Sequence, residues 1–100
     1  MRKTIRTESV DELFEAIMSL KDKEEFYEFF EDICTANEVV SIAQRLEVAK
    51  MLHENKTYTE IAAETGASTA TISRVNRSMN YGNGSYEYIF KRLDTQLPES

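Results

Sequence analysis

The sequence has few of the residues that build disulfide frameworks, metal centres and turn-rich β folds. It contains one cysteine, one histidine, one proline and three glycines among 100 residues. A single cysteine excludes an internal disulfide and fits a reducing cytoplasm, and with one histidine it makes no cluster of metal ligands. Because β turns depend on glycine and proline, we expect an all-α, cytoplasmic protein without a metal or cofactor.

Long apolar runs and catalytic motifs are also missing. No stretch approaches the roughly 18 apolar residues that a membrane span needs, and no secretory signal is visible. No nucleophile is paired with a base, no two carboxylates form an acid–base site, and no glycine-rich phosphate loop occurs. The sequence therefore predicts neither a membrane protein nor an enzyme, and its length predicts a single small domain, residues 1–100.

Acidic residues are unevenly distributed along the chain. The net charge is −6, and residues 1–40 contain five basic and eleven acidic side chains. Residues 66–93 contain four basic side chains and one acidic one. Within this region the stretch TGASTATISRVNRS, Thr65–Ser78, has six hydroxylated residues, two arginines and no acid. Because phosphates repel carboxylates, this stretch is a candidate surface for binding nucleic acid.

Apolar residues recur at helical spacing, and no segment alternates as a strand does. The pattern predicts about six helices. The first helix is expected to follow a cap at Glu8 or Ser9 and to carry an apolar stripe from Val10 to Met18. The second covers about 22–34, and a third stripe forms either one long helix or a short turn joined to a helix. The remaining predicted helices cover about 59–65, 68–78 and 84–95.

These helices divide the domain into functional segments. Residues 1–7 are expected to be a flexible arm, which is either a frayed terminus or a contact with phosphate. Residues 8–55 are expected to form dimerisation helices, because their apolar stripes exceed what so short a chain can cover. Residues 57–79 are expected to form a helix-turn-helix, and residues 84–95 a C-terminal helix. The phenylalanines expected in a core or dimer interface are Phe14, Phe26, Phe29 and Phe30.

The spacing around Gly66 is typical of a helix-turn-helix. Gly66 accepts the positive φ that a tight turn needs, and Ala62 is small enough to let two helices approach closely. Ile72 and Val75 give the second helix an apolar face towards the first. Ala62, Gly66, Ile72 and Val75 are therefore predicted to form the core of the motif. An ordinary helical hairpin is the alternative, but it has no need for a hydroxyl-rich face free of acid.

The second helix of this motif is predicted to enter the major groove of DNA. Ser68 is placed to cap it. Small hydroxylated side chains let a helix sit deep in the groove and bond base edges or phosphates, and an alanine can pack on a thymine methyl group. The predicted DNA-binding residues are Ser68, Thr69, Ala70, Thr71, Ser73, Arg74 and Arg77.

Residues from about Thr35 to Leu93 resemble the Trp repressor-like family, most closely its uncharacterised YerC/YecD branch. The resemblance is carried by AQRLEVAKML and TYTEIAAETGASTATISRVNRS, followed by a loop and a final helix. It implies an all-α, intertwined homodimer whose helix-turn-helix reads double-stranded DNA. The implied function is a sequence-specific transcriptional regulator, with repression as the expected sense.

The resemblance also implies a candidate effector site. Family members that respond to tryptophan hold it between two arginines, aided by hydroxyls. In this sequence the resemblance places Arg45 and Arg74 at the arginine positions and Thr35 and Ser78 at the hydroxyl positions. The sequence departs from that pattern at Val75, which replaces a glycine and would crowd an indole. We therefore expect that tryptophan is not the effector. Arg45 can equally form a surface salt bridge with a nearby glutamate, and Arg74 can contact phosphate alone.

A helical protein–protein interaction module without DNA binding is the alternative function. The two functions differ in their dependence on salt, because binding to phosphates weakens steeply as salt rises.

Overall fold

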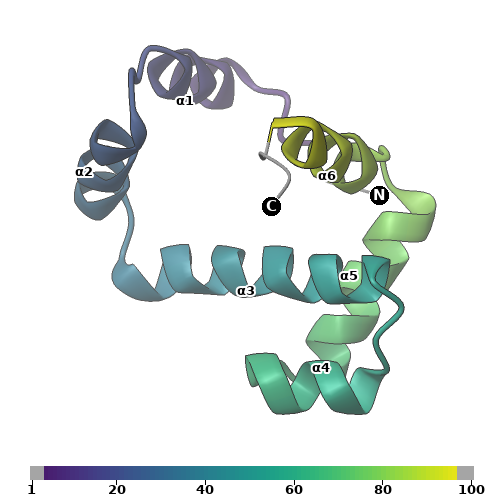
Figure 1. Cartoon of the computed structure of the whole chain (residues 1–100). Coiled ribbons are helices and arrows are strands. Elements are labelled where there is room, and N and C mark those ends of the chain that lie inside the picture. The colour runs from purple at the N-terminus through teal and green to yellow at the C-terminus, as the bar shows by residue number, and fades with distance from the viewer. Residues whose placement is uncertain (1–3, 97–100) are drawn as a thin grey trace. The chain divides into compact units, whose positions relative to one another are not determined.

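The computed structural model describes residues 4–96, which form six α-helices and no strand (Figure 1). The all-α prediction with about six helices is therefore confirmed. Residues 1–3 of the predicted arm lie outside the described residues. No helix in the described range is both long and apolar enough to cross a membrane. The helices are α1 (Glu8–Met18), α2 (Lys23–Ile33), α3 (Ala36–His53), α4 (Tyr58–Thr65), α5 (Thr69–Tyr81) and α6 (Ser85–Gln96).

The chain divides into two compact units, residues 1–39 and residues 40–100. We call them the N-terminal unit and the helix-turn-helix unit. Helix α3 begins in the first unit and ends in the second as one uninterrupted helix of 18 residues. Of the two alternatives left by the sequence, the long single helix is the one observed.

The N-terminal unit has well-capped helices but no buried residue in α1 or α2. Thr7 caps α1 by accepting the N–H of Val10, and Asp22 caps α2 in the same way. The ring of Phe30 lies 6.4 Å from that of Phe26 and 5.8 Å from that of Phe29, between centroids. These side chains therefore contact one another without forming a closed core.

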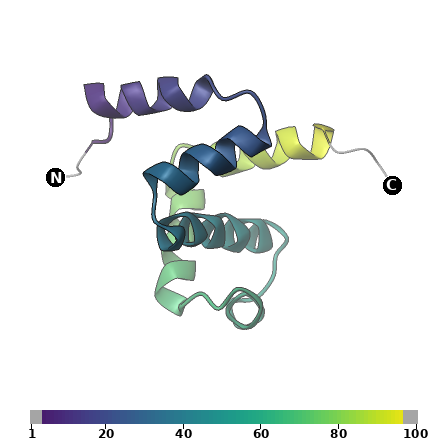
Figure 2. The same cartoon turned by 90° about the vertical axis from the view of Figure 1, so that its left-hand side faces the viewer.

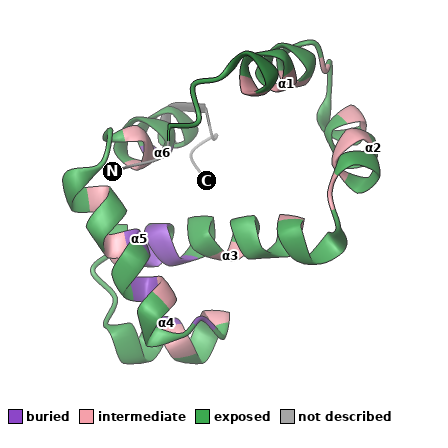
Figure 3. Cartoon of the chain, turned by 180° about the vertical axis from the view of Figure 1, so that it is seen from behind, coloured by how far each residue is buried: buried purple, intermediate pink, exposed green. Residues whose placement is uncertain are grey.

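The helix-turn-helix unit contains the buried core of the described chain. Figure 3 shows buried segments where α3, α4 and α5 meet. Because α3 supplies core residues only from its C-terminal half, the apolar residues earlier on this helix stay exposed, except for the half-buried Val39. The core residues are Val48, Ala49, Met51, Ile61, Ala67, Ile72, Val75 and Phe90, with Leu52, Ala62, Met79 and Tyr86 packed around them.

Helices α4 and α5 cross steeply, since α4 is seen along its axis in the view where α5 runs upright (Figure 2). Gly66 ends α4 with φ 74° and donates its N–H to the Ala62 carbonyl at 3.0 Å. The side-chain amide of Gln44 donates to the Thr65 carbonyl at 3.1 Å. This bond ties the turn to α3 and fixes the position from which α5 starts.

Replacing Gly66 by alanine is expected to lower the free energy of unfolding by about 1–2 kcal/mol, because alanine resists the left-handed conformation. An added Cβ would meet nothing within 4 Å, so the change tests backbone conformation without a steric clash. Gly66→Asn should lose less, since asparagine tolerates this conformation. Equilibrium urea unfolding measures both, and equal losses would contradict the explanation.

Candidate nucleic-acid interface

The start of α5 is held by Ser68. Its hydroxyl oxygen accepts the N–H of Thr71 at 3.1 Å and its hydroxyl donates to the Thr71 side-chain oxygen, also at 3.1 Å. Because the Thr71 oxygen accepts this bond, its own hydroxyl hydrogen is left to donate outward. The first turn of α5 contains no acidic residue, so nothing there would repel a phosphate.

Helix α5 has one buried face and one exposed face. Ile72 and Val75 are 0% and 3% exposed and belong to the core. On the other face Thr69, Ala70, Ser73, Arg74 and Arg77 are exposed, and Thr71 is half-buried. The predicted DNA-binding residues therefore share the outer side of one helix with its N-cap, while the apolar residues of the predicted motif core face inward.

Helix α5 is longer than the sequence suggested. It continues to Tyr81, three residues past the predicted end at 78. No helix breaker occurs before Gly82, where the helix is capped by an N–H bond to the Ser78 carbonyl. The additional turn extends the exposed face beyond Arg77.

This extension lines a hollow of about 560 Å³ on the helix-turn-helix unit. Its wall comes from the start of α4 and from α5 between Ser73 and its last residue, Tyr81. None of the lining residues is acidic, and every one carries a hydrogen-bond donor. The predicted residues among them are Ser73, Arg74 and Arg77; those that sequence reasoning missed are Tyr58, Asn76, Asn80 and Tyr81.

The four candidate effector residues are divided between the two units, with Thr35 in the N-terminal unit and the other three in the helix-turn-helix unit. Arg45, on α3, and Arg74, on α5, are exposed, and Arg45 forms no ion pair within residues 4–96. Ser78 donates its hydroxyl to the Arg74 carbonyl at 3.1 Å.

Thr35 acts in a capping box at the start of α3. Its hydroxyl accepts the N–H of Glu38 at 3.1 Å, and its own N–H donates to the Glu38 carboxylate at 2.8 Å. The backbone N–H bond, followed by the side-chain bond, holds the pKa of Glu38 below its ordinary value. This contribution to the capping box is present when Glu38 is ionised and is lost as pH falls through the lowered pKa.

Among the described residues no group of three or more histidine, cysteine, aspartate or glutamate side chains could hold a metal ion.

Comparison with known proteins identifies the family behind this geometry. The sequence profile described as Trp repressor protein matches residues 8–94. The chain belongs to the Trp repressor family. The family has a regulatory, DNA-binding fold and is not a family of enzymes, which agrees with a helix-turn-helix whose second helix, α5, contains no acidic residue.

Relatives in this Trp repressor family cover nearly the whole chain. The uncharacterized protein YerC of Bacillus subtilis is 57% identical over 96 residues, which are 96% of this chain and 92% of that protein. A TrpR-like protein of Eubacterium eligens is 60% identical, with a TM-score of 0.87 over 95% of this chain and 97% of that one. A Staphylococcus aureus structure, provisionally named a Trp repressor, is 50% identical, with a TM-score of 0.86 over 94% of each chain. The Trp repressor-like fold predicted from the sequence is thus confirmed.

Proposed function

We propose that this protein is a homodimeric, cytoplasmic, sequence-specific DNA-binding regulator that represses transcription. The supporting observation is the outer face of α5, which is exposed, rich in hydroxyls and free of acid in a chain of net charge −6. In a helix-turn-helix the first helix crosses the DNA backbone and the second reads base edges near its N-terminus. Thr69, Ala70 and Thr71 occupy that N-terminal position, and Arg74 and Arg77 follow for phosphate.

The apolar surface of a single chain supports the homodimer. Met18 on α1 is 82% exposed, Ile33 on α2 52% and Ile42 on α3 58%. Single exposed apolar residues are ordinary, but so many on consecutive helices indicate a surface that another protein covers. A second copy is the occupant that fits, because two-fold symmetry supplies the two recognition helices that a palindromic operator requires.

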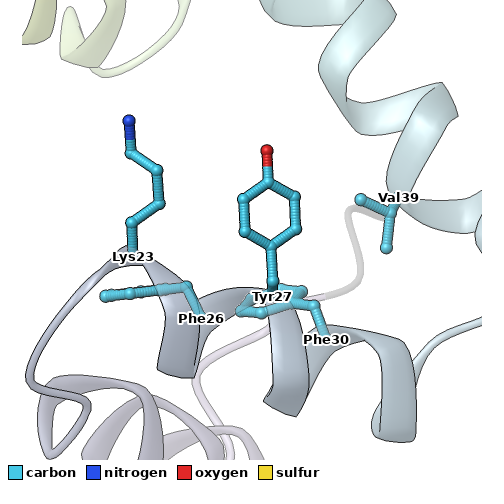
Figure 4. Close-up of a pocket in the computed structure, with 5 residues that line it drawn as sticks. All are labelled: Lys23, Phe26, Tyr27, Phe30 and Val39. Carbon is cyan, nitrogen blue, oxygen red and sulfur yellow. The ribbon is translucent and has the colours of Figure 1, made fainter.

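The hollow in the N-terminal unit adds to this surface. It encloses about 290 Å³ and is lined by Phe26, Phe30 and Val39, with Lys23 and Tyr27 extending on one side (Figure 4). Its wall is mainly apolar, so it suits an apolar side chain of the second copy better than a charged ligand. The charged end of Lys23 can stay in water while its stem covers the rim.

Selection from a random pool of DNA fragments is expected to return a palindrome whose half-sites lie about 34 Å apart, one turn of DNA. Changing Thr71 to valine should weaken binding by about 1–3 kcal/mol at particular base positions, whereas Thr71→Ser, which keeps the hydroxyl, should lose less. Electrophoretic mobility shifts with single-base variants of the selected site measure this.

Two results would count against the proposal. One is failure to retain any DNA at low salt, which would favour the protein–protein interaction module. The other is an affinity for the selected site that does not fall as salt rises, since release of counterions from phosphates is unavoidable in DNA binding.

A further inference from the structure

We propose that the hollow between the start of α4 and the end of α5 is a binding site for the DNA backbone. It would hold phosphodiester oxygens beside the major groove through the neutral donors of Tyr58, Asn80 and Tyr81 as well as through Arg77. This assignment rests on the proposed function and names residues that the sequence did not indicate.

The chemistry of the wall matches phosphate oxygens. Tyrosine, serine, asparagine and arginine are all side chains that donate to phosphates in protein–DNA complexes. Within the described residues no hydrogen bond or ion pair uses the side chains of Tyr58, Arg77 or Tyr81. Tyr81 is 82% exposed and Tyr58 37%. The donors are therefore accessible and not already used by the fold.

The position of the hollow also favours contact with the DNA backbone over contact with the bases. Ala70 and Asn80 are ten residues apart on one helix, which is about 15 Å along its axis. The major groove is about 12 Å wide, so a helix that reads bases with Ala70 has left the groove when it reaches Asn80. The end of α5 then lies against the flanking strand of phosphates.

Tyr58 brings a second helix, α4, to the same DNA strand. It is the first residue of α4, the helix that crosses the backbone in this motif. Arg77, which also lines the hollow, comes from the C-terminal half of α5. Two helices separated in sequence thus place donors around one open space, which is the arrangement needed to hold a phosphate from two sides.

Neutral and charged donors should differ in a measurable way. Loss of a cation removes a released counterion and lowers the slope of log affinity against log salt by about one. Loss of a phenol or amide donor removes a hydrogen bond and leaves that slope unchanged. We therefore expect Tyr58→Phe and Asn80→Ala each to weaken binding about three- to tenfold, equally on all DNA sequences.

The experiment measures fluorescence anisotropy with a selected site and with unrelated DNA, over a range of chloride concentrations. The variants are Tyr58→Phe, Asn80→Ala and Arg77→Ala, each first shown by thermal unfolding to be as folded as the parent. Tyr88→Phe is the matched control. Tyr88 is also an exposed tyrosine, 47% exposed, but its ring contacts Arg92 on α6, outside the hollow. This control should bind as the parent does.

The outcomes separate this proposal from the proposed function. If the parent protein binds no DNA, the proposed function fails and the backbone site fails with it. If the parent binds and Tyr58→Phe and Asn80→Ala bind equally well, only the backbone site is wrong. A loss confined to certain bases would also overturn it, because phosphates carry no sequence. Direct calorimetric binding of inorganic phosphate that Tyr58→Phe abolishes, without any change in DNA binding, would assign the hollow to a small phosphate instead.

Discussion

Replacing Ile42 by glutamate is expected to convert the protein from a dimer into monomers and to lower its affinity for a palindromic site by about 100-fold or more. Ile42 is 58% exposed on α3, so a single chain tolerates a carboxylate there. In the proposed dimer this carboxylate would be buried without a partner, which is strongly unfavourable. A monomer can contact only one half-site, so it loses the gain in affinity of about 10²–10⁴-fold that comes from joining two DNA-binding units. Light scattering and anisotropy on the same samples measure mass and affinity.

Ser41→Glu is the control for this change. It adds the same charge at the neighbouring position, which is also exposed and points about 100° around α3 from Ile42. It should remain a dimer and keep most of its DNA affinity. Equal effects from both variants would mean that charge alone is responsible, and a parent protein of monomer mass at micromolar concentration would remove the dimer from the proposal.

L-tryptophan is expected to bind weakly or not at all, and Val75→Gly is expected to raise its affinity about tenfold to a hundredfold. The Val75 side chain is 3% exposed and fills the core beside α3, so an indole on that side of α5 would meet a rigid, branched group. Overpacking of this kind typically costs about 1–3 kcal/mol, and about 1.4 kcal/mol is a factor of ten in affinity. Calorimetry with L-tryptophan, followed by DNA binding with and without it, measures both steps.

The burial of Val75 calls for a second variant. Glycine within a helix lowers stability by about 1 kcal/mol relative to alanine, and the lost side chain leaves a cavity. Val75→Ala makes room with a smaller loss of helix stability, and should give an intermediate gain in tryptophan affinity. Tight binding of tryptophan by the parent protein, with a higher affinity for its operator, would overturn the expectation.

Local features of this fold were predictable, and features assembled across the chain were not. The positive φ of Gly66 and the cap at Ser68 follow from side-chain chemistry within a few residues. Ile72 and Val75 follow from helical periodicity. The division at residue 39 within one helix has no local signal, because α3 carries apolar residues on both sides of it.

The missed site residues show the same limit. Asn80 and Tyr81 continue the face of Ser73 and Arg77 at helical spacing, but they follow residue 78, where the sequence pattern predicts the end of the helix. Tyr58 lies 19 residues before Arg77, and the two line one hollow only because α4 and α5 pack against each other. No spacing rule for a single helix could have placed it in the hollow.

Because α5 has one buried face and one exposed face, its two sets of side chains can change independently in related proteins. The side chains that anchor the helix, Ile72 and Val75, are separate from those that face outward, Thr69, Ala70 and Ser73. Exchanges among the outward positions can therefore change the outer surface of α5 without removing a core contact. In the proposed regulator, single substitutions on this face would change the preferred operator while the buried side chains stay the same.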